Sequence, residues 1–100
     1  MRVERTLYVE RIWSIQEMAV FVSMARELDN PITLEYRSGT ANGKGLLGIV
    51  SLMMKVTTGE TIRLVVSGSG ASDAMAALLK QLPLGIVADP KNQNCVSHTL

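Results

Sequence analysis

The chain has 100 residues, which suffices for one domain, and its ten basic and nine acidic residues give a net charge of +1. This balance gives no electrostatic case for nucleic acid or a membrane surface, and 4% aromatic residues are too few for a base-stacking platform. A single cysteine excludes an internal disulfide, no apolar run approaches the ~20 residues of a membrane span, and charged residues interrupt any signal-peptide pattern, so we expect a cytoplasmic domain.

The first half of the chain predicts a strand, a helix and a hairpin. Its first residues alternate between polar and apolar types, as in a half-buried strand. A stretch with apolar residues at helical spacing follows and stops before Pro31, because a proline disfavours helical geometry in the preceding residue. A turn at 37–40 then joins two strands. The expected elements are a strand at 2–9, a helix at 14–28, and strands at 32–36 and 40–43.

The second half predicts two helices around one strand. Residues 45–54 are apolar on nearly every side, so a helix here is either fully buried or offers one face to another molecule. Residues 61–67 are rich in β-branched side chains and predict a strand. Residues 72–82 have an acidic first turn and one apolar face, which favours a helix. From Pro83 onward no periodicity is sustained, and we expect only local packing at 84–87.

The order β-α-β-β-α-β-α predicts an α+β fold, in which four strands carry three helices on one face as a two-layer sandwich. We assign residues 1–83 to this domain and residues 84–100 to a C-terminal tail. No internal repeat is visible in the sequence.

Four stretches of the chain match the sequence pattern of a single known protein family. The most specific is 42–52, where Lys44, Gly48, Ser51 and Leu52 recur at a fixed spacing without a gap. The others are 19–22, 32–36, and Gly68 followed by 72–74. Over residues 3–82 the chain therefore resembles the HPr family, the small histidine phosphocarriers of the bacterial phosphoenolpyruvate-dependent sugar phosphotransferase system. The resemblance implies an open-faced sandwich with a four-stranded antiparallel sheet.

The chain departs from this family at both phosphorylation sites. HPr proteins open the first helix with Gly-Leu-His-Ala-Arg-Pro, where this chain reads Ile-Trp-Ser-Ile-Gln-Glu. Ser14 falls on the phosphate-accepting histidine, Gln16 on the arginine and Glu17 on the proline. Gly45 falls on the regulatory serine of many Gram-positive members. The chain thus resembles a divergent HPr without the active-site histidine, and it differs from the catabolite-repression paralogue, which keeps that serine.

The altered helix start predicts a structural role for Ser14. Ser14-Ile15-Gln16-Glu17 is a capping-box pattern, worth about 1 kcal/mol, and the Glu17 carboxylate would occupy the place of a bound phosphoryl group. An unassisted serine is a poor nucleophile, and nothing places the single histidine, His98, beside it. Phosphorylation of Ser14 is the alternative.

No other motif predicts chemistry. Residues 43–48 lack the spacing of a phosphate-binding P-loop, and Cys95 with His98 supplies only two metal ligands. We therefore expect no metal, no cofactor and no enzymatic activity.

The second helix is the best candidate for a binding surface. In HPr proteins the exposed faces of the first two helices dock onto partners, and an apolar patch there suits a protein interface. Trp13 is either an exposed anchor beside this surface or a buried staple at the helix start. Alternatively, the patch packs under the tail or in a homodimer. The partner-binding candidates are Trp13, Ser14, Gln16, Gly45, Leu46, Leu47 and Val50.

We expect a regulatory or adaptor protein that binds proteins of the phosphotransferase system, or a regulator, without histidine phosphocarrier activity. It would be a monomer or homodimer and would bind neither nucleic acid nor membrane. The alternative is a phosphocarrier component with an atypical acceptor such as Ser14.

Overall fold

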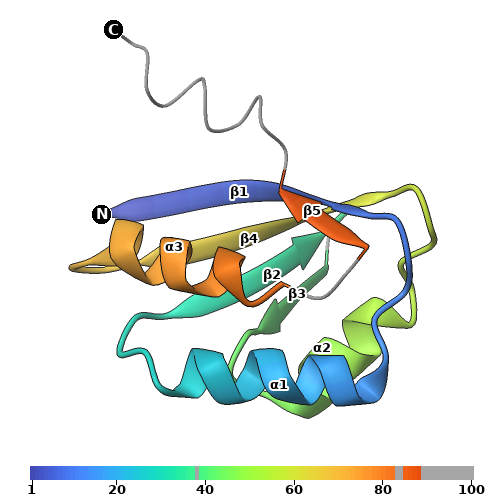
Figure 1. Cartoon of the computed structure of the whole chain (residues 1–100), viewed down its shortest axis with the longest axis horizontal. Coiled ribbons are helices and arrows are strands. Elements are labelled where there is room, and N and C mark those ends of the chain that lie inside the picture. The colour runs from blue at the N-terminus through green and yellow to red at the C-terminus, as the bar shows by residue number, and fades with distance from the viewer. Residues whose placement is uncertain (38, 83–84, 89–100) are drawn as a thin grey trace, which may run out of the picture.

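The computed structural model describes residues 1–37, 39–82 and 85–88. The helices of the described residues lie on one side of a twisted sheet (Figure 1). The longest helix described has 12 residues, so none of those described could cross a membrane. The elements are β1 (Arg2–Val9), α1 (Ile15–Arg26), β2 (Ile32–Tyr36), β3 (Gly39–Asn42), α2 (Leu46–Met53), β4 (Thr61–Ser67), α3 (Ala71–Lys80) and β5 (Ile86–Ala88).

The sheet has the strand order β3-β2-β4-β1-β5, and every neighbouring pair is antiparallel. The pairing of β1 with β4 runs from Arg2 opposite Ser67 to Tyr8 opposite Thr61. The expected α+β sandwich with helices on one face is therefore confirmed. The first, second and fourth strands also have the expected bounds.

The expected strand number of four is wrong, because β5 adds a fifth strand from residues that we had assigned to the tail. Gly85 has a φ of 90°, a left-handed conformation that suits glycine, and it leads the chain back along β1. Ile86 is then buried and pairs with Val9. Three residues are too few to show an alternating pattern, so the sequence carried no periodic signal for this strand. Leu84, where we also expected packing, lies outside the described residues.

The core lies between the sheet and the helices. In β1 the side chains of Leu7 and Val9 are buried, whereas Tyr8 between them is exposed on the face without helices. The helices contribute buried residues such as Phe21 of α1 and Leu78 of α3. One face of the sheet therefore remains open, as the open-faced architecture requires.

The helices α1 and α2 run in opposite directions along their contact. At the end of α1, the Arg26 Nε donates a hydrogen bond of 2.9 Å to the backbone oxygen of Lys44, just before α2. The Lys44 Nζ in turn donates to the backbone oxygen of Leu28. The first turn of α2 therefore lies toward the end of α1, and the last turn of α2 lies toward the start of α1 (Figure 1).

Candidate functional site

Ser14 caps the start of α1. Its backbone is extended, with φ −77° and ψ 162°, and its Oγ accepts a hydrogen bond of 3.1 Å from the backbone N–H of Glu17. The Glu17 Oε1 accepts in return from the backbone N–H of Ser14 at 2.9 Å. The predicted capping box is thus confirmed, and it satisfies two N–H groups at the start of the helix.

The Glu17 carboxylate is also bound to Arg11. The Arg11 Nη1 donates to Oε1 at 3.0 Å and Nη2 donates to Oε2 at 2.7 Å, a bidentate pair. Hydrogen bonds from the Arg11 guanidinium, and next from the Ser14 backbone, lower the pKa of the Glu17 carboxyl from 4.5 to about 2. The same interaction raises the pKa of Arg11. Glu17 is therefore ionised throughout the physiological range of pH.

The turn into β5 lies directly against Arg11. The Glu10 N–H donates to the backbone oxygen of Gly85 at 2.7 Å, which places Gly85 directly against the next residue. A Cβ added at Gly85 would lie 2.8 Å from the Arg11 Cβ. The absence of a side chain at Gly85 therefore lets this turn approach Arg11, whose guanidinium reaches Glu17.

The Glu17 carboxylate places a negative charge at the start of α1. The N–H groups at the start of a helix attract an anion, and here the anion is Glu17. Ser14 has an exposed hydroxyl, but the adjacent carboxylate is a poor base, because its pKa is about 2. The chain's single histidine, His98, and Cys95 lie outside the described residues. In the described part of the chain no three metal-ligating side chains cluster together.

Trp13 is buried, which corrects its assignment as an exposed anchor. Only 3% of its surface is accessible, and its ring lies 5.3 Å from that of Phe21, tilted by 59°. The alternative, burial at the helix start, is confirmed. An aromatic residue before a helix suits either role, and the apolar stripe of α1, which includes Phe21, supplies the surface that covers it.

The structure exposes only part of the predicted apolar patch. Leu47 is 81% exposed, but Leu46 and Val50 are half-buried and pack against the core. Gly45 is the N-cap of α2 and makes no side-chain capping bond. Ser14 and Gln16 are exposed at the other end of α1 from the start of α2.

Three exposed apolar residues near the start of α1 were not predicted. Ile15 is 63% exposed in the first turn of α1, and Met54 is 81% exposed just after α2. Ile12 precedes the helix and is 40% exposed. Ile15 has the helical spacing of the buried residues Met18, Val22 and Ala25, so periodicity gave no signal for its exposure in the first turn.

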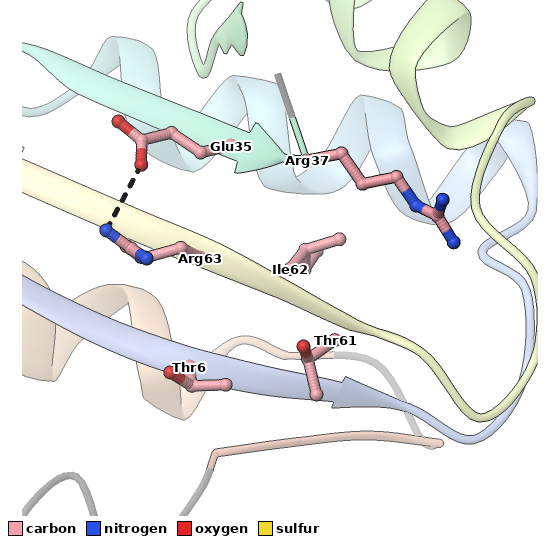
Figure 2. A pocket seen from close by; sticks show the side chains of 6 residues that line it. All are labelled: Thr6, Glu35, Arg37, Thr61, Ile62 and Arg63. Atoms are coloured by element: carbon pink, nitrogen blue, oxygen red, sulfur yellow. Dashed lines mark ion pairs between the residues drawn. The ribbon is translucent and has the colours of Figure 1, made fainter. Parts of the chain in front are cut away.

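A shallow polar pocket of about 150 Å³ lies on the open face of the sheet. Figure 2 shows Glu35 of β2 pointing toward Arg63 of β4, and these two form an ion pair at 3.6 Å. Arg2 and Glu4 extend this pair into a network of two arginines and two glutamates. Arg37, which also lines the pocket, pairs with Glu60 at 2.6 Å, so each charged residue of the lining has a partner of opposite sign. Its lining residues are Thr6, Glu35, Arg37, Thr61, Ile62 and Arg63.

Comparisons with known proteins agree with this fold. The family model described as the PTS HPr component phosphorylation site matches residues 15–82, a range that begins directly after Ser14. The phosphocarrier protein HPr from Bacillus anthracis is 28% identical with a TM-score of 0.68, covering 82% of this chain and 98% of that one. HPr-C-His from Thermoanaerobacter tengcongensis is 26% identical with a TM-score of 0.68, and the match covers 79% of this chain and 89% of that one. Crh from Bacillus subtilis is 26% identical with a TM-score of 0.60, and the match covers 75% of this chain and 87% of that one.

Proposed function

Because the chain belongs to the HPr family, we propose that it is a regulatory or adaptor protein that binds partner proteins and does not carry phosphate on a histidine. HPr proteins are phosphocarriers and not catalysts, and we assign no enzymatic activity to this chain. We place it in the cytoplasm, with proteins of the phosphotransferase system or a regulator as partners.

The observation that carries this proposal is the carboxylate at the start of α1. Glu17 accepts hydrogen bonds from the Ser14 backbone N–H and from Arg11, and it remains ionised above a pH of about 2. A phosphoryl group at this place would have to displace a bound anion of the same sign. In addition, position 14 offers a hydroxyl and no imidazole nitrogen.

Phosphotransfer can be measured directly. The purified chain is incubated with phosphoenolpyruvate and the first enzyme of the phosphotransferase system, and its intact mass is determined. HPr from Bacillus anthracis, treated in parallel, is the positive control. We expect the control to gain one phosphoryl group and this chain to gain none. Stoichiometric phosphorylation of this chain would overturn the proposal.

A phosphocarrier component that uses Ser14 is the second candidate. The exposure of the Ser14 hydroxyl at a helix start favours it, because backbone N–H groups there stabilise a nearby anion. Phosphate on Ser14 would be found by fragment mass spectrometry of the same reaction. The Ser14→Ala variant would abolish it, whereas phosphate at another residue would persist in that variant.

We place the docking surface on the exposed faces of α1 and α2. It combines exposed polar positions at the start of α1 with exposed apolar side chains from both helices, a mixture common in protein interfaces. Leu46 and Val50 pack against the core beside it, Gly45 is the N-cap of α2, and Trp13 is buried before α1. The surface consists of Ile12, Ser14, Ile15, Gln16, Leu47 and Met54.

Binding to the first enzyme of the phosphotransferase system tests this surface. Affinity is measured by titration calorimetry for the unmodified chain and for the Leu47→Asp variant. Tyr8→Asp, a similar change of an exposed residue on the helix-free face of the sheet, is the matched control. We expect Leu47→Asp to weaken binding at least about tenfold, since a charge in an interface core is left unpaired. Equal affinities of the two variants would contradict the placement of the surface.

A second copy of the chain is a further partner for the same surface. The Bacillus subtilis Crh structure is described as a domain-swapped, intertwined dimer, so an HPr-like scaffold can form dimers. Sedimentation at several protein concentrations shows whether the chain associates with itself or remains a monomer that is free to bind another protein. A dimer that dissociates in Leu47→Asp but not in Tyr8→Asp would assign the surface to self-association.

A further inference from the structure

The methionines of this chain differ widely in their exposure to solvent. Of the six, Met54 is 81% exposed and Met1 is 78% exposed. The other four are buried in the core or partly buried against it: Met18, Met24, Met53 and Met75. An exposed thioether is open to oxidants in solution, whereas a buried thioether reacts only when the surrounding structure opens.

The contrast is sharpest between two consecutive residues at the end of α2. Met53 is 1% exposed and lies in the core with Ile49 and Leu52. Met54 has helical dihedral angles, with φ −64° and ψ −20°, and its N–H donates to the Val50 backbone oxygen at 3.1 Å. Each residue of a helix turns the side chain by about 100°, so Met54 points away from the core that receives Met53. The two methionines therefore share a sequence context and differ in access to solvent.

Met54 lies on the same side of α2 as Leu47. The two are seven residues apart, which is close to two helical turns, and both are 81% exposed. The last turn of α2 lies toward the start of α1, so Met54 belongs to the end of the docking surface that lies toward Ile12 and Ile15 (Figure 1). The inference that follows rests on the docking surface proposed above.

We infer that Met54 is an oxidation site and that its oxidation by a peroxide weakens binding at the docking surface. A lone pair of the Met54 Sδ attacks one oxygen of hydrogen peroxide, so that an S–O bond forms and the O–O bond breaks. The departing oxygen takes the proton of the transferred oxygen and leaves as water. The sulfur loses two electrons and the peroxide gains them. The product is methionine sulfoxide, which methionine sulfoxide reductases convert back to methionine.

The sulfoxide changes the chemistry of an apolar position in the interface. A methionine side chain is flexible and apolar, which suits a surface that adapts to a partner. A sulfoxide oxygen is polar, and it requires a hydrogen-bond donor when an interface excludes water. A partner surface that fits Leu47 and Met54 as apolar side chains supplies no such donor. The fold is expected to tolerate the change, because the Met54 side chain is 81% exposed.

Peptide mapping by mass spectrometry tests the selectivity of oxidation. The full chain is treated with a limited amount of hydrogen peroxide, the peroxide is removed, and fragment ions distinguish oxidation of Met53 from oxidation of Met54. We expect Met54 to be oxidised at least about tenfold faster than Met53, because Met53 is protected by the core.

Titration calorimetry with the first enzyme of the phosphotransferase system tests the effect on binding. The unmodified chain and the Met54→Leu variant are each compared with their own oxidised form. Leucine keeps an apolar side chain of similar volume without sulfur. Met1 and Cys95 are present in both proteins, so their oxidation affects both alike. We expect oxidation to weaken binding of the unmodified chain at least about tenfold and to leave that of Met54→Leu unchanged, and we expect reductase treatment to restore the affinity.

Each alternative outcome has a separate meaning. Equally rapid oxidation of Met53 and Met54 would show that exposure does not select the site. An equal loss of affinity in oxidised Met54→Leu would assign the effect to another residue. If oxidation left the affinity unchanged while Leu47→Asp weakened it, the docking surface would stand and the inference about Met54 would be wrong. If Leu47→Asp also had no effect, the docking surface itself would be wrong, and the inference would fail with it.

Discussion

Replacing Ser14 by alanine removes one defined half of the capping box. The Ser14 Oγ accepts the Glu17 N–H at 3.1 Å, and alanine has no acceptor for it. The other hydrogen bond uses the backbone N–H of residue 14, which alanine keeps. The loss is therefore that of one N-cap acceptor, about 1 kcal/mol of unfolding free energy. For a domain of this size, about 1 kcal/mol corresponds to a decrease in Tm of roughly 4–8 °C.

Urea denaturation followed by tryptophan fluorescence measures this loss. Trp13 is the single tryptophan of the chain and is buried against Phe21, so its emission reports on the helix start. Ser14→Thr keeps a hydroxyl acceptor and should retain most of the stability, and Ser14→Gly should cost only a few tenths of a kcal/mol. If Ser14→Ala and Ser14→Thr had the same midpoint, the hydroxyl would not be acting as a cap.

Three further predictions concern the same part of the molecule. The Glu17 carboxyl should titrate near pH 2 when followed by NMR, and the Arg11→Gln variant should raise its pKa toward 4.5. Because the pKa is lowered in the folded state, the stability that Glu17 adds should be fully present above pH 4.5 and should be lost as the pH falls through about 2. Gly85→Ala should lower the free energy of unfolding by about 1 kcal/mol or more and raise the Glu17 pKa, whereas Gly59→Ala, which has a similar positive φ but open space around it, should leave that pKa unchanged. Leu47→Asp should change the unfolding free energy by less than about 0.5 kcal/mol in thermal denaturation, because its side chain is 81% exposed.

Local patterns were sufficient to predict most of the fold. The strand at 61–67 was predicted to the residue, because the segment is rich in β-branched side chains. The capping box at Ser14 and Glu17 was also predicted, since both partners lie within four residues of each other. These features depend on short-range spacing, which a single sequence contains in full.

Features that depend on tertiary contacts could not be predicted in this way. The strand β5 exists because β1 offers an edge and Gly85 can turn beside Arg11, and neither condition is visible in three residues of sequence. The Arg11–Glu17 pair was missed for a related reason. A spacing of six residues across a helix start is not one of the i,i+3 or i,i+4 spacings that bring side chains together on a helix, so only the path of the chain brings these two together.

The capping box of Ser14 and Glu17 and the turn into β5 are physically connected through Arg11. A phosphocarrier must leave the N–H groups at the start of α1 free to receive and release a phosphoryl group. In this chain the Glu17 carboxylate accepts the backbone N–H of Ser14, and Arg11, which lies against Gly85, lowers the pKa of that carboxyl. A histidine introduced at position 14 would therefore still face a helix start that already carries the Glu17 carboxylate. The altered site is a set of mutually supporting contacts, so its chemistry does not depend on the identity of residue 14 alone.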